Sequence, residues 1–143
     1  MNLTEQQQQW LDDLVFKGEV SHEVSLLNGN VTITLVNISG EKQLEVEKAV
    51  AGTDGTALYV MHQYALNLLS QVLKKFTTKE GTTEFKSAKE AYEFIKSRPT
   101  VIIDAMTKAQ TAFEAELQKI TAPEVVTENF SKTPETAEGS NSI

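Results

Sequence analysis

The chain of 143 residues has no cysteine, only three prolines and one tryptophan. The absence of cysteine excludes disulfides, thiolate metal sites and a cysteine nucleophile, and it is consistent with a reducing cytoplasm. No apolar stretch approaches the ~20 residues that cross a bilayer, so we expect no membrane partner. The first residues lack a basic region followed by an apolar run, and we therefore predict no signal peptide.

Positive charge is also scarce, because 13 basic residues face 20 acidic ones and the net charge is -7. This balance favours solubility and opposes unspecific attraction to nucleic acid. The nearest approach to a basic patch is formed by Lys74, Lys75 and Lys79, at the predicted end of a helix. Cations are favoured there by the exposed carbonyl groups. We therefore expect no nucleic-acid partner.

The sequence predicts an amphipathic helix at the start of the chain. Thr4 and Gln7 have the spacing of a capping box, and Gly18 is a natural helix stop. Trp10 is read as a core anchor in preference to an interface hot spot. The predicted apolar face of the helix consists of Trp10, Leu11, Leu14 and Val15.

A β-hairpin is the clearest local signal in the sequence. Asn28-Gly29 accepts the positive φ angles of a tight hairpin turn, and apolar residues alternate with polar ones on both sides. Pairing outward from the turn sets Leu26 opposite Val31, with the apolar side chains on one face. A lone hairpin is marginally stable, so another element must cover this face.

The rest of the chain is predicted to be helical, with Pro99 breaking or restarting the last helix. A short helix over 41–51 has Leu44 and Val50 as inward positions, and a long helix runs from about 56 to 77. Residues 77–86 form a polar loop, and Ser87 with Glu90 opens the next helix. Ten positions are predicted to form the core: Leu26, Val31, Ile33, Leu68, Leu69, Val72, Phe94, Ile102, Met106 and Phe113.

These elements predict an α+β fold, with an N-terminal helix, an antiparallel β-hairpin and a compact group of about four helices. Residues 1–121 form a single domain, and residues 122–143 form a flexible acidic tail. Val125, Val126 and Phe130 are the large apolar residues of that tail. They either order on a partner or fray without function, and fraying is favoured.

No motif in the sequence predicts catalysis or metal binding. His22 and His62 lack a second ligand at helical metal-site spacing, and no Gly-x-Ser-x-Gly elbow is present. The turn Gly52-Thr-Asp-Gly55 lacks the end of a phosphate-binding loop. The acidic residues Glu41, Glu45 and Glu47, and also Asp12 and Asp13, are interpreted as solvated faces. We predict no catalytic, cofactor-binding or metal-binding residue, no cofactor and no enzymatic activity.

The order of features resembles that of a known class of proteins. The hairpin sequence from Glu23 to Leu35 precedes an acidic helix opened by Ser39, an apolar helix with Leu68-Leu69, and the segment Ser87-Ala-Lys-Glu-Ala-Tyr-Glu-Phe. This order is similar to that of small tail-assembly chaperones and baseplate-hub accessory proteins of tailed bacteriophages. The resemblance covers roughly residues 20–121, concerns pattern and length only, and transfers no site residue.

The resemblance implies a protein-binding factor that acts in the assembly of a phage tail or baseplate. Its partner would be a tail tube, tape-measure or baseplate-hub protein, and it would act in the host cytoplasm. A permanent structural subunit of the virion is the alternative, and a small hydrolase or nucleotide-binding enzyme is the disfavoured third reading. A homo-oligomer is a further alternative.

Overall fold

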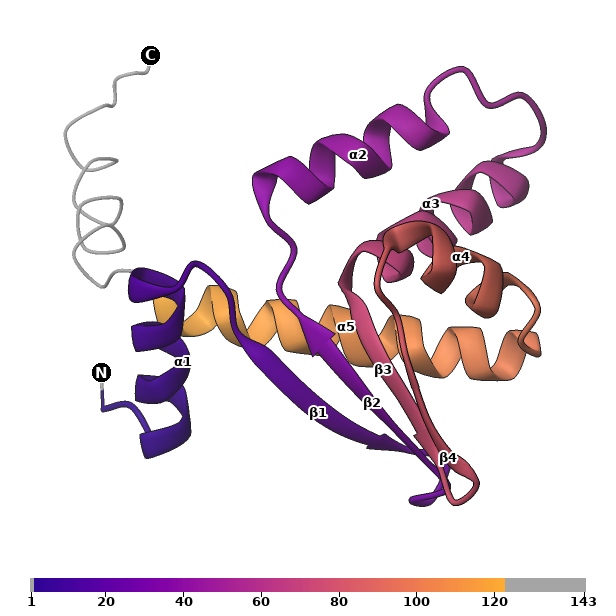
Figure 1. Ribbon diagram of the computed structural model, residues 1–143. Coiled ribbons are helices and arrows are strands. Elements are labelled where there is room, and N and C mark those ends of the chain that lie inside the picture. Colours follow the sequence, from indigo (N-terminus) through magenta and orange to yellow (C-terminus); the bar gives the residue numbers. More distant parts are fainter. Residues whose placement is uncertain (1, 123–143) are drawn as a thin grey trace, which may run out of the picture.

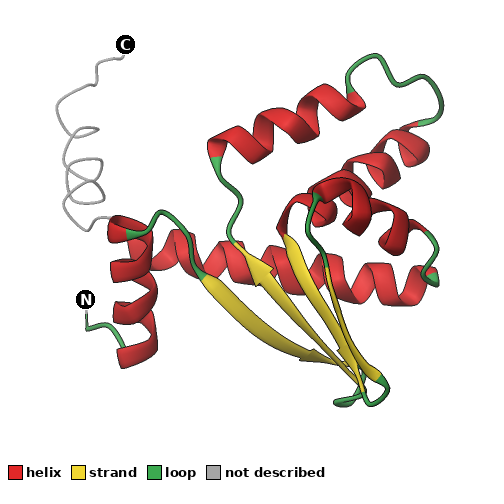
Figure 2. Cartoon of the chain, in the orientation of Figure 1, coloured by secondary structure: helices red, strands yellow, loops and turns green. Residues whose placement is uncertain are grey.

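The computed structural model describes residues 2–122, and the fold is α+β, as predicted (Figures 1 and 2). Within these residues a four-stranded antiparallel sheet is combined with helices that precede, interrupt and follow its strands. Residues 123–143, with the predicted tail and its apolar residues, lie outside the described part. The elements are α1 (Glu5–Phe16), β1 (Ser21–Leu26), β2 (Val31–Val36), α2 (Gly40–Val50), α3 (Ala57–Val72), β3 (Leu73–Thr78), β4 (Gly81–Glu84), α4 (Ala88–Lys96) and α5 (Thr100–Thr121).

The predicted hairpin is present with the predicted register. Leu26 pairs with Val31, and Val24 pairs with Ile33. Asn28 has a φ of 56° and Gly29 one of 84°, which are the left-handed angles that this type of turn requires. The Asn30 N–H closes the turn on the carbonyl of Leu27 at 3.1 Å. Local turn chemistry and side-chain alternation were therefore sufficient to place these two strands.

The long helix ends at Val72, five residues before the predicted end, and the chain continues directly as strand β3. Phe76 pairs with Ile33 of β2, so the sheet has two more strands than the predicted hairpin. The register of β2 and β3 shifts between Thr34 and Leu35, which leaves one extra residue on β3. Because of this bulge, Leu73 and Phe76 are both buried although they are three residues apart. That spacing imitates a helix and explains why the helix prediction was too long.

The predicted polar loop over 77–86 is also wrong in part, because it contains β4. All four residues of β4 are exposed, so the segment lacks the alternating hydrophobicity by which a strand is recognised. Lys74 and Lys75 consequently lie on β3 and Lys79 in the turn to β4, not at a helix end. The Lys75 Nζ lies 3.7 Å from the Glu84 Oε2, and the two residues are partners in the register.

The core lies between the sheet and the helices packed on one of its faces. In Figure 1, α5 runs behind the strands, and α1 lies beside β1. Phe94 of α4 contacts Phe76 of β3, with their ring centroids 5.0 Å apart, so α4 covers the sheet near its β3–β4 end. Of the predicted core residues, Val31, Ile33, Leu69, Val72, Met106 and Phe113 are buried, whereas Leu26, Leu68, Phe94 and Ile102 are partly buried.

Two predicted helix faces need correction. Leu44 of α2 is 62% exposed, whereas Val46 is fully buried. The α2 helix packs beside α3, where the Gln43 side-chain amide donates a hydrogen bond to the Tyr64 hydroxyl at 2.9 Å. The inward side of α2 is therefore set by α3 and not by the sheet. In α1 the capping box of Thr4 with Gln7 is present, but Val15 is 67% exposed.

Candidate protein-binding surfaces

His22 joins α1, β1 and α5 in one aromatic cluster. The His22 ring lies 4.9 Å from the ring of Trp10 and 5.0 Å from that of Phe113. Trp10 and Phe113 are 5.3 Å apart and both buried, so Trp10 is a core anchor. Burial among these rings lowers the pKa of His22 below its ordinary value of 6.5. The partial burial of His22 is therefore explained by its packing between aromatic rings of the core.

The other candidate polar groups are dispersed over the surface. His62 is exposed on α3, and Glu41, Glu45 and Glu47 are exposed on α2. Across residues 2–122 no group of three or more His, Cys, Asp or Glu residues is arranged to hold a metal ion. In the same residues, no helix is long and apolar enough to cross a membrane.

One half-buried carboxylate has a structural partner. The Glu114 side chain of α5 accepts a hydrogen bond from the Ile38 N–H at 2.7 Å. Burial raises the pKa of Glu114 above its ordinary value, and this backbone hydrogen bond opposes the rise. Nearby, the Val20 N–H donates to the Asn37 side-chain oxygen at 2.6 Å. Both bonds satisfy backbone donors where the chain enters β1 and leaves β2.

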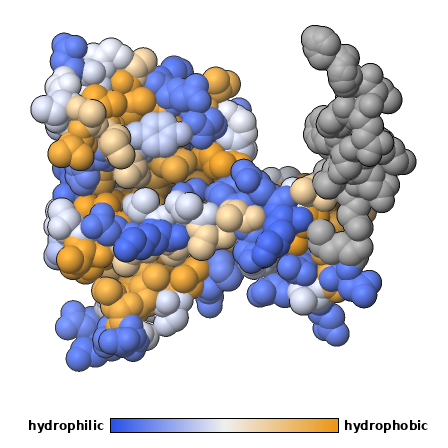
Figure 3. Space-filling view, turned by 180° about the vertical axis from the view of Figure 1, so that it is seen from behind, coloured by the Kyte–Doolittle hydropathy of each residue, from blue (hydrophilic) through white to orange (hydrophobic). Residues whose placement is uncertain are grey.

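An exposed apolar stripe lies on the first half of α3. Leu58, Met61, Ala65, Leu68 and Val72 are spaced three and four residues apart and therefore share one helix face. At the C-terminal end of the stripe Val72 is fully buried, whereas Leu58 is 78% and Met61 66% exposed. Figure 1 shows that α3 starts beyond the sheet and reaches it only near its C-terminal end. Seen from behind in Figure 3, hydrophobic surface is extensive on the side of the molecule that carries α3.

The same helix carries no formal charge. No Asp, Glu, Lys or Arg occurs between Asp54 and Lys74, in a chain with a net charge of -7. Depletion of charge together with Tyr and Met side chains is the compositional signature of the core of a protein interface. Leu58 and Met61 were not among the predicted core residues, and the lack of charge in this segment is a sequence signal that indicates a surface covered by another protein.

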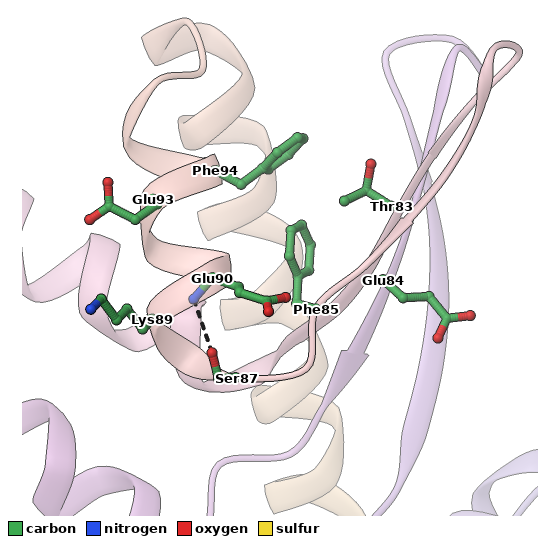
Figure 4. Close-up of a pocket in the computed structure, with 8 residues that line it drawn as sticks. All are labelled: Thr83, Glu84, Phe85, Ser87, Lys89, Glu90, Glu93 and Phe94. Atoms are coloured by element: carbon green, nitrogen blue, oxygen red, sulfur yellow. Dashed lines mark hydrogen bonds between the residues drawn. The ribbon is translucent and has the colours of Figure 1, made fainter.

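A second apolar hollow lies between β4 and α4. Its volume is about 550 Å³, and Phe85 and Phe94 line it with their ring centroids 5.1 Å apart. Figure 4 shows the two rings close together between α4 and β4, with Thr83 across the opening. The hydrogen bond from the Glu90 N–H to the Ser87 hydroxyl, 3.2 Å long, fixes the start of α4 beside this hollow.

A neighbouring hollow of about 370 Å³ shares Thr83 and Phe94 with the first, so the two form one groove along β4. We call this the β4–α4 groove. Arg98, the only arginine of the chain, lines its far end. The guanidinium lies 4.2 Å from the centroid of the Phe94 ring, and its Nε donates to the Phe94 carbonyl at 3.2 Å. The charge is thus held at the groove, where it can pair with an anionic group.

Comparison with known proteins adds no relative. No protein-family model, no curated protein and no solved structure matches the chain.

Proposed function

We propose that this protein is a non-enzymatic binding factor that holds another protein during the assembly of a bacteriophage tail or baseplate. The observation that carries the binding role is the apolar stripe of α3, where Leu58 and Met61 are exposed on a helix without formal charge. Large exposed apolar side chains are costly to solubility and mark interaction sites when they gather on one element. The phage context rests on the resemblance in the order of sequence features.

The chemistry of the surface defines what the partner must offer. An uncharged helix face with Leu and Met side chains fits an apolar groove or an amphipathic helix, in the helix-in-groove manner. Flexible Met side chains adapt to a partner's shape, which suits a factor that holds its client temporarily. From the resemblance in the order of features, the proposed partner is a tail tube, tape-measure or baseplate-hub protein, and it must present an apolar surface before it is assembled.

The test is purification of the protein from its native source, followed by quantitative mass spectrometry of soluble complexes and of finished particles. We expect tail or baseplate proteins in the soluble complexes and little of the protein in particles. A fixed copy number in particles would replace the chaperone role by that of a permanent subunit. Recovery without any assembly protein would overturn the proposed function.

Two variants tie the result to the stripe. Leu58→Glu and Met61→Glu place a charge on the stripe, and we expect each to reduce recovery of the partner by about tenfold or more. Phe16→Glu is the matched control, because Phe16 is 82% exposed but lies on α1. Equal loss of partner in all three variants would contradict binding through α3.

A further inference from the structure

We propose that the β4–α4 groove binds an extended peptide segment of a partner protein, which pairs with β4 as a fifth strand of the sheet. The segment runs antiparallel to β4, carries apolar side chains at alternate positions and ends in an acidic residue beside Arg98. This site is separate from the stripe of α3 and does not depend on the proposed function.

The backbone of β4 determines which groups are open to a fifth strand. Phe85 lies opposite Lys74 in the register, and its N–H donates to the Lys74 carbonyl at 3.0 Å. Hydrogen-bonded and non-hydrogen-bonded pairs alternate along an antiparallel ladder. The alternation directs the N–H and C=O groups of Thr83 toward β3, and those of Thr82 and Glu84 away from it. Because β4 is the last strand of the sheet within residues 2–122, these outward groups form an edge that a further strand can join.

Besides open backbone groups, a strand-addition site needs space for the side chains of the added strand, and the side chains along the same edge leave this space. Thr83 pairs with Phe76, whose side chain is in the core, so Thr83 lies on the core-facing side of β4. Thr83 is nevertheless exposed, because α4 stands away from it across the groove. A fifth strand would place every second side chain into this space, against Phe85 and Phe94. Main-chain pairing then gives affinity and the groove gives specificity, as in other cases of strand addition.

The charges on the groove select the direction and the chemistry of the segment. Arg98 and Glu80 line the Gly81 end, and Lys89 lines the other end together with Glu84, Glu90 and Glu93. An antiparallel segment begins beside Phe85 and ends beside Gly81, so an acidic residue near its C-terminal end meets Arg98. A basic residue at that position would repel the guanidinium. Pairing of an acidic side chain with the Arg98 guanidinium therefore favours this register of the segment.

The other edge of the sheet lacks this combination. The Asn37 N–H donates to the Val20 carbonyl opposite it, so the same alternation leaves the backbone groups of Ser25 facing outward on β1. On the core-facing side of β1, however, His22 is already covered by Trp10 of α1. At its His22 end the β1 edge thus offers hydrogen-bonding groups where Trp10 already occupies the core-facing side, and β1 provides the matched control.

The first experiment uses a synthetic probe, acetyl-Thr-Val-Thr-Phe-Thr-Asp-Thr-amide, with the full-length protein. Its Val, Phe and Asp side chains fall on one face, opposite Phe85, Thr83 and Gly81. We expect saturable binding with a Kd below about 1 mM in an NMR chemical-shift titration of the protein with the probe. In hydrogen exchange followed by NMR, the Thr82 and Glu84 amides should gain about tenfold protection on binding, while that of Thr83 is already protected in the free protein.

Variants at the two edges separate strand addition from adsorption to an apolar surface. Thr82→Pro removes an outward N–H without removing a ladder bond to β3, as proline is tolerated on edge strands. We expect it to abolish binding of the probe, whereas Ser25→Pro on β1 leaves binding unchanged. Thermal unfolding checks that each variant is folded. If Thr82→Pro does not fold, the exchange data and Arg98→Glu in the next experiment still decide the question.

Charge reversal tests the role of Arg98. Arg98→Glu should weaken binding of the probe about fivefold, and a probe with Lys in place of Asp should regain about the same factor on this variant. Leu58→Glu should leave the affinity for the probe unchanged, which distinguishes this site from the stripe of α3.

Three outcomes would overturn the proposal. The first is that no saturable binding occurs at about 1 mM probe and the Thr82 and Glu84 amides gain no protection. The second is that binding persists in Thr82→Pro, which would mean that the groove takes an apolar ligand without strand pairing. The third is a concentration-dependent dimer in sedimentation velocity that Thr82→Pro abolishes and Ser25→Pro does not, which would assign the edge to a second copy of this chain.

Discussion

The two edges of the sheet end in opposite ways. At β1, the ring of His22 is packed between Trp10 of α1 and Phe113 of α5, so three elements close the core on that side. At β4, Phe85 and Phe94 face an open groove and every residue of the strand is exposed. One edge of the sheet is thus joined to the core by packed aromatic rings, and at the other edge the apolar layer is incomplete.

Aromatic residues therefore have different roles at the two edges of the sheet. Aromatic side chains that are packed on all sides contribute mainly to stability, whereas rings that line an open groove leave apolar surface for a ligand. We therefore expect substitutions near β1 to change the free energy of unfolding, and substitutions near β4 to change binding.

The largest effect is expected at the closed edge. Phe113→Ala removes a buried ring that contacts both Trp10 and His22, and it should lower the free energy of unfolding by about 3–5 kcal/mol. Urea denaturation followed by the fluorescence of Trp10 measures this loss directly. A loss below about 1 kcal/mol would show that the cluster does not close the core and would remove the contrast between the edges.

A smaller loss is expected for Glu114, whose carboxylate holds the backbone where β2 leaves the sheet. Glu114→Ala leaves the Ile38 N–H without its acceptor and should cost about 1–3 kcal/mol in urea denaturation. Glu114→Gln keeps an oxygen for this N–H and is the matched control.

The pH dependence of Glu114 sharpens that comparison. The folded-state pKa of Glu114 is raised above its ordinary value of 4.5, so the native protein binds the proton more tightly than the unfolded chain. The contribution of Glu114 to stability is therefore fully present below pH 4.5, and it falls as the pH rises through the folded-state pKa. The stability of Glu114→Gln relative to the wild type should rise over the same range, and a difference that is independent of pH would contradict this.

At the open edge, a substitution should lower the free energy of unfolding by a still smaller amount. Phe85→Ala removes a ring that borders the β4–α4 groove, and it should lower the free energy of unfolding by only about 1 kcal/mol while weakening binding of the synthetic probe. Measuring unfolding and probe affinity on one sample separates the two roles. A loss as large as that of Phe113→Ala would mean that the β4 edge is also a closed part of the core.

The smallest effect concerns protonation of His22. Its folded-state pKa is lowered, so the unfolded chain binds the proton more tightly. The contribution of His22 is fully present above its ordinary pKa of 6.5 and is lost as the pH falls through the folded-state value. Urea denaturation between pH 7.5 and 5.5 should show this loss in the wild type and a weaker dependence in His22→Phe. Parallel curves for the two proteins would exclude a role for the imidazole.

Sequence patterns predicted those elements whose signals are local. The Asn28-Gly29 turn has its own backbone preference, and Thr4 and Gln7 cap α1 within one helical turn, so both were found. The candidate binding surfaces could not be predicted in this way. Exposure of Leu58, and the incomplete covering of Phe85, depend on how far α3 and the β4 edge extend beyond their neighbours, and amphipathic periodicity is the same for covered and uncovered faces.

The sequence by itself determined the α+β class, the register of β1 with β2 and the burial of Trp10, because turn chemistry and side-chain alternation act between near neighbours along the chain. Only the tertiary structure decided that the residues after Val72 form β3 and β4. A bulge aligned Leu73 and Phe76 on one face, and pairing with β2 outweighed the local helical spacing. The same long-range pairing made β4 an edge strand, and with it created the groove beside α4.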